Sequence, residues 1–453
     1  MLLNRMHMNQ TSSKARGVLE LVRTFAAGGP TAGYLHAQLG EARALESILH
    51  AFNYLPPAIE AGQAGPMAGV PVAVKDIIAT FDMPTTNGSA IYRDCIPAND
   101  AWAVRRLRDL GATIFGKTVT TEFAWRHPGA TVNPWNPKHT PGGSSSGSAA
   151  CVAAGLVPLA LGTQTLGSVI RPAAFNGVVG LKPSYGAIPR VGVHPLSLSL
   201  DHVGLFTRNV DDAAYALSQL LGTSELDMHG RPLPPFEVSV EEGLAPLEKP
   251  RIAVMRMALW SRAEPEQQRL FNEAVKKLHD AGAVVKDVDY PAMDRAGWSS
   301  VTTILSSEAS VLFSDYADTH PDKVSKWLKD LAQTGKSHSA YTYLTARRFQ
   351  DEQHVEFANL MADFDIVLTL PAFGEAPEGL DYTGDAEYCA PWTLLGVPAV
   401  TTPAGFGKNG LPLGIQIVGK YRDDLRLLRA AKWVEQILDF EPGLPPIAVS
   451  RKT

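Results

Sequence analysis

Two turns rich in glycine and serine hold the residues of this sequence that could do nucleophilic chemistry. The first, PGGSSSGSAACVAAG at residues 141–155, places three serines after two glycines and then becomes an alanine-rich helical run. The second, GTQTLGSVIRPA at residues 162–173, places Ser168 behind a glycine and ahead of a predicted helix. Backbone N–H groups at a helix start suit a developing oxyanion, and glycine lets the backbone approach a reacting centre closely. A lone turn of this kind is usually a simple loop, but two together favour a serine nucleophile.

A serine hydroxyl needs a base, and the sequence offers a lysine more readily than a histidine. The chain has no G-x-S-x-G elbow. Lys75 ends the apolar run GVPVAV, so it emerges from a predicted buried strand, and burial can hold a lysine amine neutral. A lysine at a strand end is most often solvated, and only the combination with the two turns makes it a candidate base. The histidines near the turns belong to no recognisable motif: His127, His139, His194 and His202.

The segments around these residues resemble the motifs of the amidase signature family. They are GVPVAVKD around Lys75, GGSSSGSAA around Ser144 and GTQTLGSVIRPAAFNGVVGLKPSYG around Ser168. The similarity spans nearly the whole chain, from AFNYL near residue 51 to LPLGIQIVG near the C-terminal end. The resemblance implies a Ser-cisSer-Lys triad with Ser168 as nucleophile, Ser144 as a bridging serine in a cis peptide linkage, and Lys75 as base.

The same resemblance implies roles for the neighbouring residues and a reaction. Ser145 would support the triad through hydrogen bonds, and the oxyanion hole would consist of the N–H groups of Thr165, Leu166, Gly167 and Ser168. The implied reaction is hydrolysis of a small carboxylic amide to an acid and ammonia or an amine, through an acyl-serine intermediate. It requires no metal and no cofactor.

Several residues near the nucleophile are candidates for choosing the substrate. The usual family motif GTDTGGS is GTQTLGS here, so Gln164 replaces a carboxylate and Leu166 replaces a glycine. The version with Gln occurs in a branch of the family that includes malonamidase-like enzymes. Arg171 lies three residues after Ser168, where its guanidinium could hold a substrate carboxylate, such as that of a dicarboxylic half-amide. It could equally pair with an internal carboxylate or with loop carbonyls. Gln164, Phe123 and Trp125 are further candidates for contact with the substrate, although aromatic side chains more often pack in the hydrophobic core.

Composition excludes several other classes of protein. The chain has 453 residues, 45% of them hydrophobic, and a net charge of -5, so it lacks the basic surface that nucleic acid or an anionic membrane requires. Its longest apolar run, residues 149–161, is shorter than the about 20 residues that span a bilayer. Three scattered cysteines indicate neither disulfides nor a zinc site, and Cys389 lacks the context of a nitrilase-type nucleophile. We expect a cytoplasmic enzyme that binds a small-molecule amide, with a homodimer left open.

Short β-type runs alternate with helical patterns, which predicts an α/β fold with a large mixed central β-sheet covered by helices on both faces. Strands are expected at residues 69–74, 112–116, 251–255, 284–290, 365–370 and 413–419, and helices from Asp100 as cap to Leu110 and from about Glu264 to Ala281. We expect a single domain over residues 21–445, with a core at about residues 60–215, a helical lobe at about residues 296–363 and a flexible segment at residues 1–20. Residues 224–249 are rich in Pro, Glu and Gly and are a candidate excursion.

Two other functions remain open from the sequence. The glutaminase subunit of the tRNA-dependent amidotransferase shares all three motifs, but it usually carries GGSIRQPA, whereas Pro172 follows Arg171 directly here. A catalytically silent binding homologue is the alternative outside catalysis, because the implied chemistry depends on a neutral Lys75.

Overall fold

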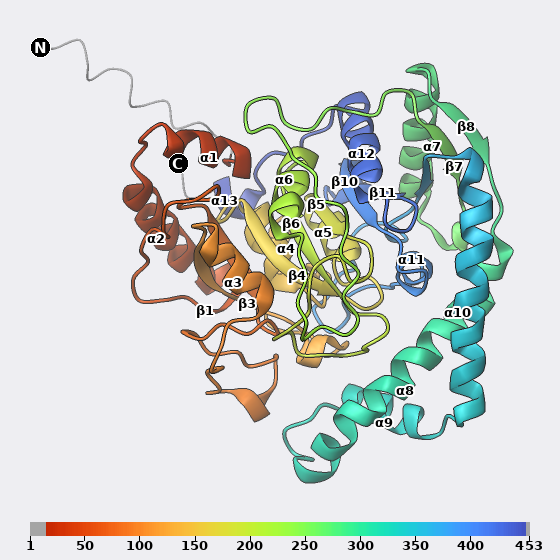
Figure 1. Ribbon diagram of the computed structural model, residues 1–453, viewed down its shortest axis with the longest axis horizontal. Coiled ribbons are helices and arrows are strands. Elements are labelled where there is room, and N and C mark those ends of the chain that lie inside the picture. Colours follow the sequence, from red (N-terminus) through yellow and green to blue (C-terminus); the bar gives the residue numbers. More distant parts are fainter. Residues whose placement is uncertain (1–14, 450–453) are drawn as a thin grey trace, which may run out of the picture.

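One mixed β-sheet runs through the computed structural model, which describes residues 15–449 (Figure 1). Within these residues the sheet has 11 strands in the order β1-β3-β2-β4-β6-β5-β10-β11-β9-β7-β8. Strand β2 runs parallel to β3 and β4, and β7 runs parallel to β8 and β9, whereas the other neighbours are antiparallel. The predicted mixed sheet is therefore confirmed. The strands are β1 Phe52–Tyr54, β2 Pro71–Lys75, β3 Thr113–Thr118, β4 Leu159–Gln164, β5 Val179–Lys182, β6 His202–Thr207, β7 Arg251–Val254, β8 Val284–Asp287, β9 Ile366–Thr369, β10 Ala399–Phe406 and β11 Pro412–Val418.

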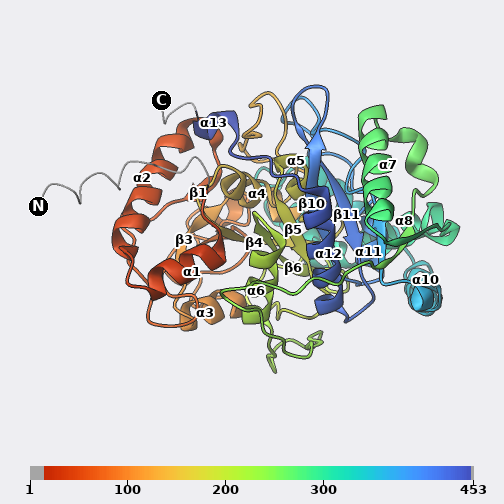
Figure 2. The ribbon, with the colours of Figure 1, turned by 90° about the horizontal axis from the view of Figure 1, so that it is seen from above.

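Helices cover both faces of this sheet. Helices α4 and α5 contact each other on one face, while α6 contacts α1, α3 and α12 on the other, and Figure 2 shows the two groups on opposite sides of the strands. The helices are α1 Val18–Ala26, α2 Thr31–Leu49, α3 Trp102–Asp109, α4 Ser146–Ala153, α5 Ile170–Asn176, α6 Val210–Leu220, α7 Pro265–Asp280, α8 Arg295–Thr319, α9 Lys326–Lys336, α10 Ala340–Leu360, α11 Ala390–Leu394, α12 Asp424–Leu438 and α13 Pro446–Val449.

The alternation of side chains along β2 explains why its sequence is apolar throughout. Val72 and Val74 enter the larger hydrophobic core, whereas Ala73 enters the second core, on the face of α4. Successive side chains of a strand point to opposite faces, so a strand buried on both faces needs a continuous apolar run. The small side chain of Ala73 also leaves room for α4 to pack closely on the sheet, which brings the first serine-rich turn near the end of β2.

Helices α8, α9 and α10 form a lobe beside the sheet. Helix α8 packs against both α9 and α10, and Figure 1 shows the three helices extending to the lower right of the strands. The lobe contacts the rest of the protein through α11 and through loop residues next to the serine-rich turns. No helix in the range 15–449 is both long enough and apolar enough to cross a membrane.

The structure departs from the sequence-based expectations at three places in the chain. Asp100 does not cap α3, because Ala101 occupies that position; the Asp100 carboxylate instead accepts from Phe81 N and pairs with Arg108. The segment expected to be flexible, residues 1–20, lies outside the described residues as far as residue 14, but its last three residues belong to α1. Strand β10 was not expected from its sequence pattern, although it pairs with both β5 and β11.

Candidate active site

Strands β2 and β4 place the predicted base next to the second serine-rich turn. The two strands are parallel neighbours, with Ala73 opposite Ala160, so their carboxyl ends meet at the same edge of the sheet. Lys75 is the last residue of β2, and the segment from Gln164 to Ser168 leaves the end of β4. Carboxyl ends of adjacent parallel strands are where open α/β sheets gather functional groups.

Lys75 is fully buried, with an exposed fraction of 0%. Its Nζ donates to Ser144 Oγ at 2.7 Å and to Thr163 Oγ1 at 2.8 Å, and it forms no ion pair among the described residues. Burial holds the pKa of this amine well below its usual value, and the nearby carboxylate of Asp201 opposes that shift only in part. Burial therefore favours the neutral amine, the form in which a lysine can accept a proton.

Ser144 lies where the first serine-rich turn meets α4. The peptide bond between Gly143 and Ser144 is cis, and the carbonyl of Ser144 accepts a hydrogen bond from Thr121 N at 3.2 Å. The next residue, Ser145, donates from Oγ to the carbonyl of Thr163 at 3.2 Å and accepts from the N–H of Thr163 at 3.3 Å. This exchange fastens the start of α4 to the end of β4, and thus holds both serine-rich turns together.

A cavity of about 260 Å³ opens over these turns, and both Ser144 and Ser168 lie in its wall. The backbone N–H groups of Leu166, Gly167 and Ser168 donate no hydrogen bond within residues 15–449, and all three residues line the cavity, as does Thr165. Unpaired donors at a cavity wall are what a developing oxyanion requires. Gly167 allows the turn to lie close to Cys389, because a Cβ at this position would approach the Cβ of Cys389 to 3.1 Å.

Gln164 shapes the turn from behind and is not part of the cavity wall among the described residues. Its Oε1 accepts from Val169 N at 2.9 Å and from Ile170 N at 3.0 Å, and its Nε2 donates to Thr393 Oγ1 at 3.1 Å. The amide therefore satisfies N–H groups at the start of α5 that otherwise lack a partner. The expectation that Gln164 contacts the substrate does not match this placement.

Arg171 lies in the cavity wall, yet it is almost completely buried. Its Nη2 donates to the carbonyl of Gly143 at 2.6 Å and more weakly to Thr383 Oγ1 at 3.4 Å. Its Nε has no hydrogen-bond partner, and no carboxylate pairs with the guanidinium in the part of the chain that the structure describes. Desolvation by burial lowers the pKa of Arg171. The side chain thus supports the first turn while still offering positive charge to the cavity.

The two aromatic candidates, Phe123 and Trp125, have different surroundings in the structure. Trp125 lines the cavity, and its Nε1 donates to the carbonyl of Trp327 in α9. Phe123 is absent from the described cavity wall, because it packs in an aromatic cluster with Tyr92, His194, Phe313 and Tyr316. Phe123 therefore supports the wall and does not form its surface.

The helical lobe closes one side of the cavity with Trp298, Leu305 and Trp327. Carboxylates hold the lobe in place: Glu122 accepts from Ser325 N at 3.2 and 3.1 Å through its two oxygens, and Glu308 accepts from both Ser197 and Ser199. None of these contacts follows from a local sequence pattern, because each joins residues more than 100 positions apart.

Acidic residues also occur in the wall, and two of them are neutralised by one arginine. Arg262 pairs with Asp385 at 3.0 Å and with Glu387 at 2.7 Å, and its guanidinium lies over the ring of Phe373. Sequence reasoning missed this group, and it also missed Thr163 and the buried carboxylate of Asp201, which accepts from Thr165 Oγ1 at 2.6 Å. The segment SLDHVGLF around Asp201, a polar start followed by an apolar run, was the available signal.

Alternative nucleophiles and bases find no support in the geometry. Cys389 is fully buried, its Sγ contacts the carbonyl of Pro371, and burial raises the pKa of its thiol to about 12. No histidine belongs to the cavity wall as the structure describes it. Lys75 is therefore the described side chain best placed to deprotonate a cavity serine.

Comparisons with known proteins show the family of the chain. A family model described as Amidase matches residues 42–428. A glutamyl-tRNA(Gln) amidotransferase subunit of Thermus thermophilus is 36% identical over 406 residues, covering 82% of this chain and 85% of that protein. The protein of the same name from Alkaliphilus metalliredigens is 32% identical over 443 residues, covering 88% and 89%. The solved peptide amidase of Stenotrophomonas maltophilia superposes with a TM-score of 0.81 and 28% identity, covering 94% of this chain and 98% of that chain.

Proposed function

Since the chain belongs to the amidase family and is an amide-hydrolysing enzyme, we propose that Ser168 is its nucleophile, Ser144 its proton bridge and Lys75 its base. The observation that carries this proposal is the buried amine of Lys75, which lies 2.7 Å from Ser144 Oγ and has no ion-pair partner among the described residues. Ser144 shares a cavity wall with Ser168. A lysine in that position does little to stabilise the fold, because burying an isolated cation costs free energy.

The proposed reaction begins with proton transfer and attack. Neutral Lys75 takes a proton from Ser144 as Ser144 takes one from Ser168, and Ser168 Oγ forms a bond to the amide carbon. The carbonyl π electrons move to oxygen, where the N–H groups of Leu166, Gly167 and Ser168 stabilise the negative charge. The intermediate collapses by breaking the C–N bond, and the leaving nitrogen receives a proton from the Lys75 ammonium through Ser144.

Deacylation uses the same relay, with water in the place of Ser168. Water loses a proton through Ser144 to Lys75 and attacks the acyl carbon, and the bond to Ser168 Oγ then breaks. Ser168 recovers its proton through the relay, and the acid leaves. One amide and one water give one acid and one ammonia or amine.

For the substrate, we propose a small amide that carries a carboxylate, held by Arg171. Two features support this substrate class: Arg171 lies in the cavity wall without an anionic partner among the described residues, and its buried Nε has no hydrogen-bond partner. A buried unpaired charge gains most from a ligand that neutralises it. Hydrogen bonds to Gly143 and Thr383 fix the guanidinium in position and leave its charge available.

A second candidate function is favoured by the relatives themselves. The relatives from Thermus thermophilus and Alkaliphilus metalliredigens are glutamyl-tRNA(Gln) amidotransferase subunits, which favours a glutaminase subunit that works beside partner chains. Hydrolysis restricted to glutamine, together with a stoichiometric partner that remains bound through purification, would favour this function. Activity of the isolated chain on other small amides would favour the independent amidase.

The test of the primary proposal is a screen for ammonia release from small amides, combined with a fluorophosphonate probe. We expect the wild-type protein to be labelled and active, and Ser168→Ala to be unlabelled and inactive while remaining folded. Ammonia should be released faster from malonamate and succinamate than from propionamide and butyramide, which are their uncharged counterparts. A folded wild-type protein that is neither labelled nor active would instead identify a silent binding homologue.

A further inference from the structure

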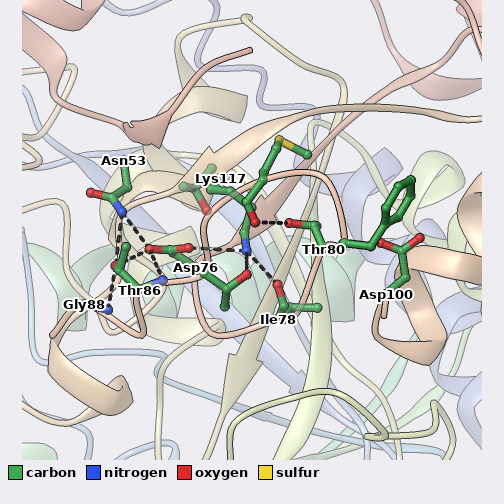
Figure 3. Close-up of polar contacts among 12 residues, drawn as sticks. Asn53, Asp76, Ile78, Thr80, Thr86, Gly88, Asp100 and Lys117 are labelled. Carbon is green, nitrogen blue, oxygen red and sulfur yellow. Dashed lines mark hydrogen bonds and ion pairs between the residues drawn. The ribbon is translucent and has the colours of Figure 1, made fainter. Parts of the chain in front are cut away.

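The residue that follows Lys75 belongs to a buried ion pair that lies outside the described cavity wall. Asp76 and Lys117 have exposed fractions of 1% and 0%, and Lys117 Nζ lies 3.3 Å from Asp76 Oδ1. Figure 3 shows the two side chains pointing toward each other, with Asp76 directly after the end of β2 and Lys117 in the adjacent parallel strand β3. Lys117 Nζ also donates to the carbonyl of Ile78 at 2.8 Å and to Thr85 Oγ1 at 2.5 Å.

The second carboxylate oxygen of Asp76 gathers a different set of donors. Its Oδ2 accepts from Asn53 Nδ2 at 2.7 Å, from Thr86 Oγ1 at 2.5 Å and from Thr86 N at 3.2 Å, as drawn in Figure 3. Asn53 lies in β1, and Thr86 lies in the loop after β2. One carboxylate thus connects three strands and a loop around the position where Lys75 leaves the sheet.

The backbone of Asp76 is held at the same point. Its N–H donates to the carbonyl of Thr118 at 3.0 Å, and its carbonyl accepts from Asn87 N at 2.9 Å. The carbonyl of Lys75 accepts from Ile78 N at 2.9 Å, and Lys117 holds the carbonyl of Ile78 in turn. The chain is therefore fixed on the C-terminal side of Lys75 by contacts that all meet at the Asp76–Lys117 pair.

The same contacts extend to the cavity wall. The carbonyl of Asn87 accepts from Phe123 N at 2.8 Å, and Phe123 directly precedes two wall residues, Ala124 and Trp125. A shift of the loop that Asp76 holds would therefore move both the base and one side of the cavity.

Stability alone is a weak reason for such a pair. Burial raises the pKa of Asp76 and lowers the pKa of Lys117 to about 8, so both charged forms cost free energy, although Asp82 and Asp100 add negative potential near Lys117. Replacing a buried ion pair with apolar residues is often neutral or stabilising in other proteins. What the pair does supply is a fixed geometry for its neighbours.

We propose that Asp76 and Lys117 are positioning residues that hold the Lys75 amine within reach of Ser144. This inference rests on the proposed function, in which Lys75 is the base. Neither residue touches the substrate, and both act through the backbone next to Lys75. Displacement of a reacting group by about 1 Å can reduce a rate about 100-fold, so a modest relaxation here has a large effect on catalysis.

The test is the kcat per active site, with sites counted by complete fluorophosphonate labelling of Ser168. Asp76→Asn and Lys117→Met should each lower kcat by roughly 10- to 100-fold on an amide that the wild type hydrolyses, with KM changed by less than about threefold. Asp212→Asn is the matched control, because Asp212 is an equally buried carboxylate whose contacts lie at α1 and α6. It should lower stability and leave kcat per labelled site unchanged.

Two further variants keep the inference testable if a single substitution prevents folding. Thr86→Val removes one donor to Asp76 and no charge, and it should lower kcat by about threefold. Asp76→Asn/Lys117→Met removes both charges together and should recover stability but not kcat. Wild-type kcat per labelled site in these variants would overturn the inference. An inactive wild type, or a Lys75→Ala variant with wild-type activity, would overturn the proposed function as well.

Discussion

The amine of Lys75 lies 2.7 Å from Ser144 Oγ. The carboxylate of Asp201 forms no ion pair with this amine, but its charge raises the pKa of Lys75 and so partly offsets the effect of burial. This relationship leaves the amine dependent on burial for its protonation state. A neutral lysine is available only while water remains excluded, so the site couples the packing at the end of β2 to the chemistry at Ser168.

The pH dependence of kcat/KM should report the titration of Lys75. Burial lowers the pKa of this amine well below its usual value of about 10.4, and activity requires the neutral form. Activity is therefore present above the pKa in the folded protein and is lost as pH falls through it. The profile is measured on the wild type and on Asp201→Asn, because a Lys75→Met variant without activity has no profile to compare. A wild-type profile that stays flat into the acid range would contradict the assignment.

Replacing the base should stabilise the fold. Between its folded and unfolded pKa values Lys75 binds fewer protons in the folded protein, so at neutral pH it contributes an unfavourable term that fades as pH rises toward about 10. Lys75→Met should therefore raise the thermal midpoint at pH 7 by roughly 1 to 3 °C while abolishing activity. Thermal unfolding followed by circular dichroism measures the shift, and Lys277→Met is the control for an exposed lysine. A lower midpoint for Lys75→Met would contradict the assigned protonation state.

Substitution of Arg171 should lower kcat/KM for amides that carry a carboxylate more than for neutral amides. Arg171→Gln should reduce kcat/KM for malonamate by roughly 10- to 100-fold, because a charge-assisted hydrogen bond to a carboxylate is worth about 1.5 to 3 kcal/mol. The loss for propionamide should stay below about threefold. Equal losses on both substrates would mean that Arg171 serves only to support the carbonyl of Gly143.

Substitution of Gln164 should lower the stability of the fold and leave substrate binding unchanged. Gln164→Leu leaves the N–H groups of Val169 and Ile170 without their acceptor, which should cost about 1 to 3 kcal/mol in the free energy of unfolding. Gln164→Glu keeps an acceptor for both groups and should cost less. Denaturant unfolding compares the two variants, and a KM change confined to one substrate class would instead restore Gln164 as a substrate contact.

The parts of the site that follow strand ends could be predicted from the sequence. An apolar run ending in Lys75 and a glycine-rich turn carrying Ser168 are local patterns, and parallel pairing of β2 and β4 brings them to one edge. The role of Gln164 could not be predicted in the same way, because it depends on how the turn folds back over α5, and a motif alone does not encode this.

The remaining contacts could not be predicted, because they join distant parts of the chain. Arg262 reaches Asp385 and Glu387 across more than 100 residues, and Trp125 reaches Trp327 across 202. Phe123 and Trp125 lie two residues apart with similar side chains, yet only Trp125 faces the cavity. The local path of the backbone decides such a difference, and only the tertiary structure supplies it.

Asp201 links the oxyanion turn to the base, which gives the most discriminating pH experiment. Its carboxylate accepts from Thr165 Oγ1 at 2.6 Å and from the N–H groups of Leu196 and Ser197 at 2.8 and 3.0 Å, while Arg190 lies nearby with opposite charge. The negative charge stabilises protonated Lys75 and so raises its pKa. Asp201→Asn should therefore move the acid limb of kcat/KM to lower pH. It should also reduce kcat at the plateau by roughly tenfold, because the amide no longer holds Thr165 as strongly. An acid limb that moves to higher pH would contradict the electrostatic role of Asp201.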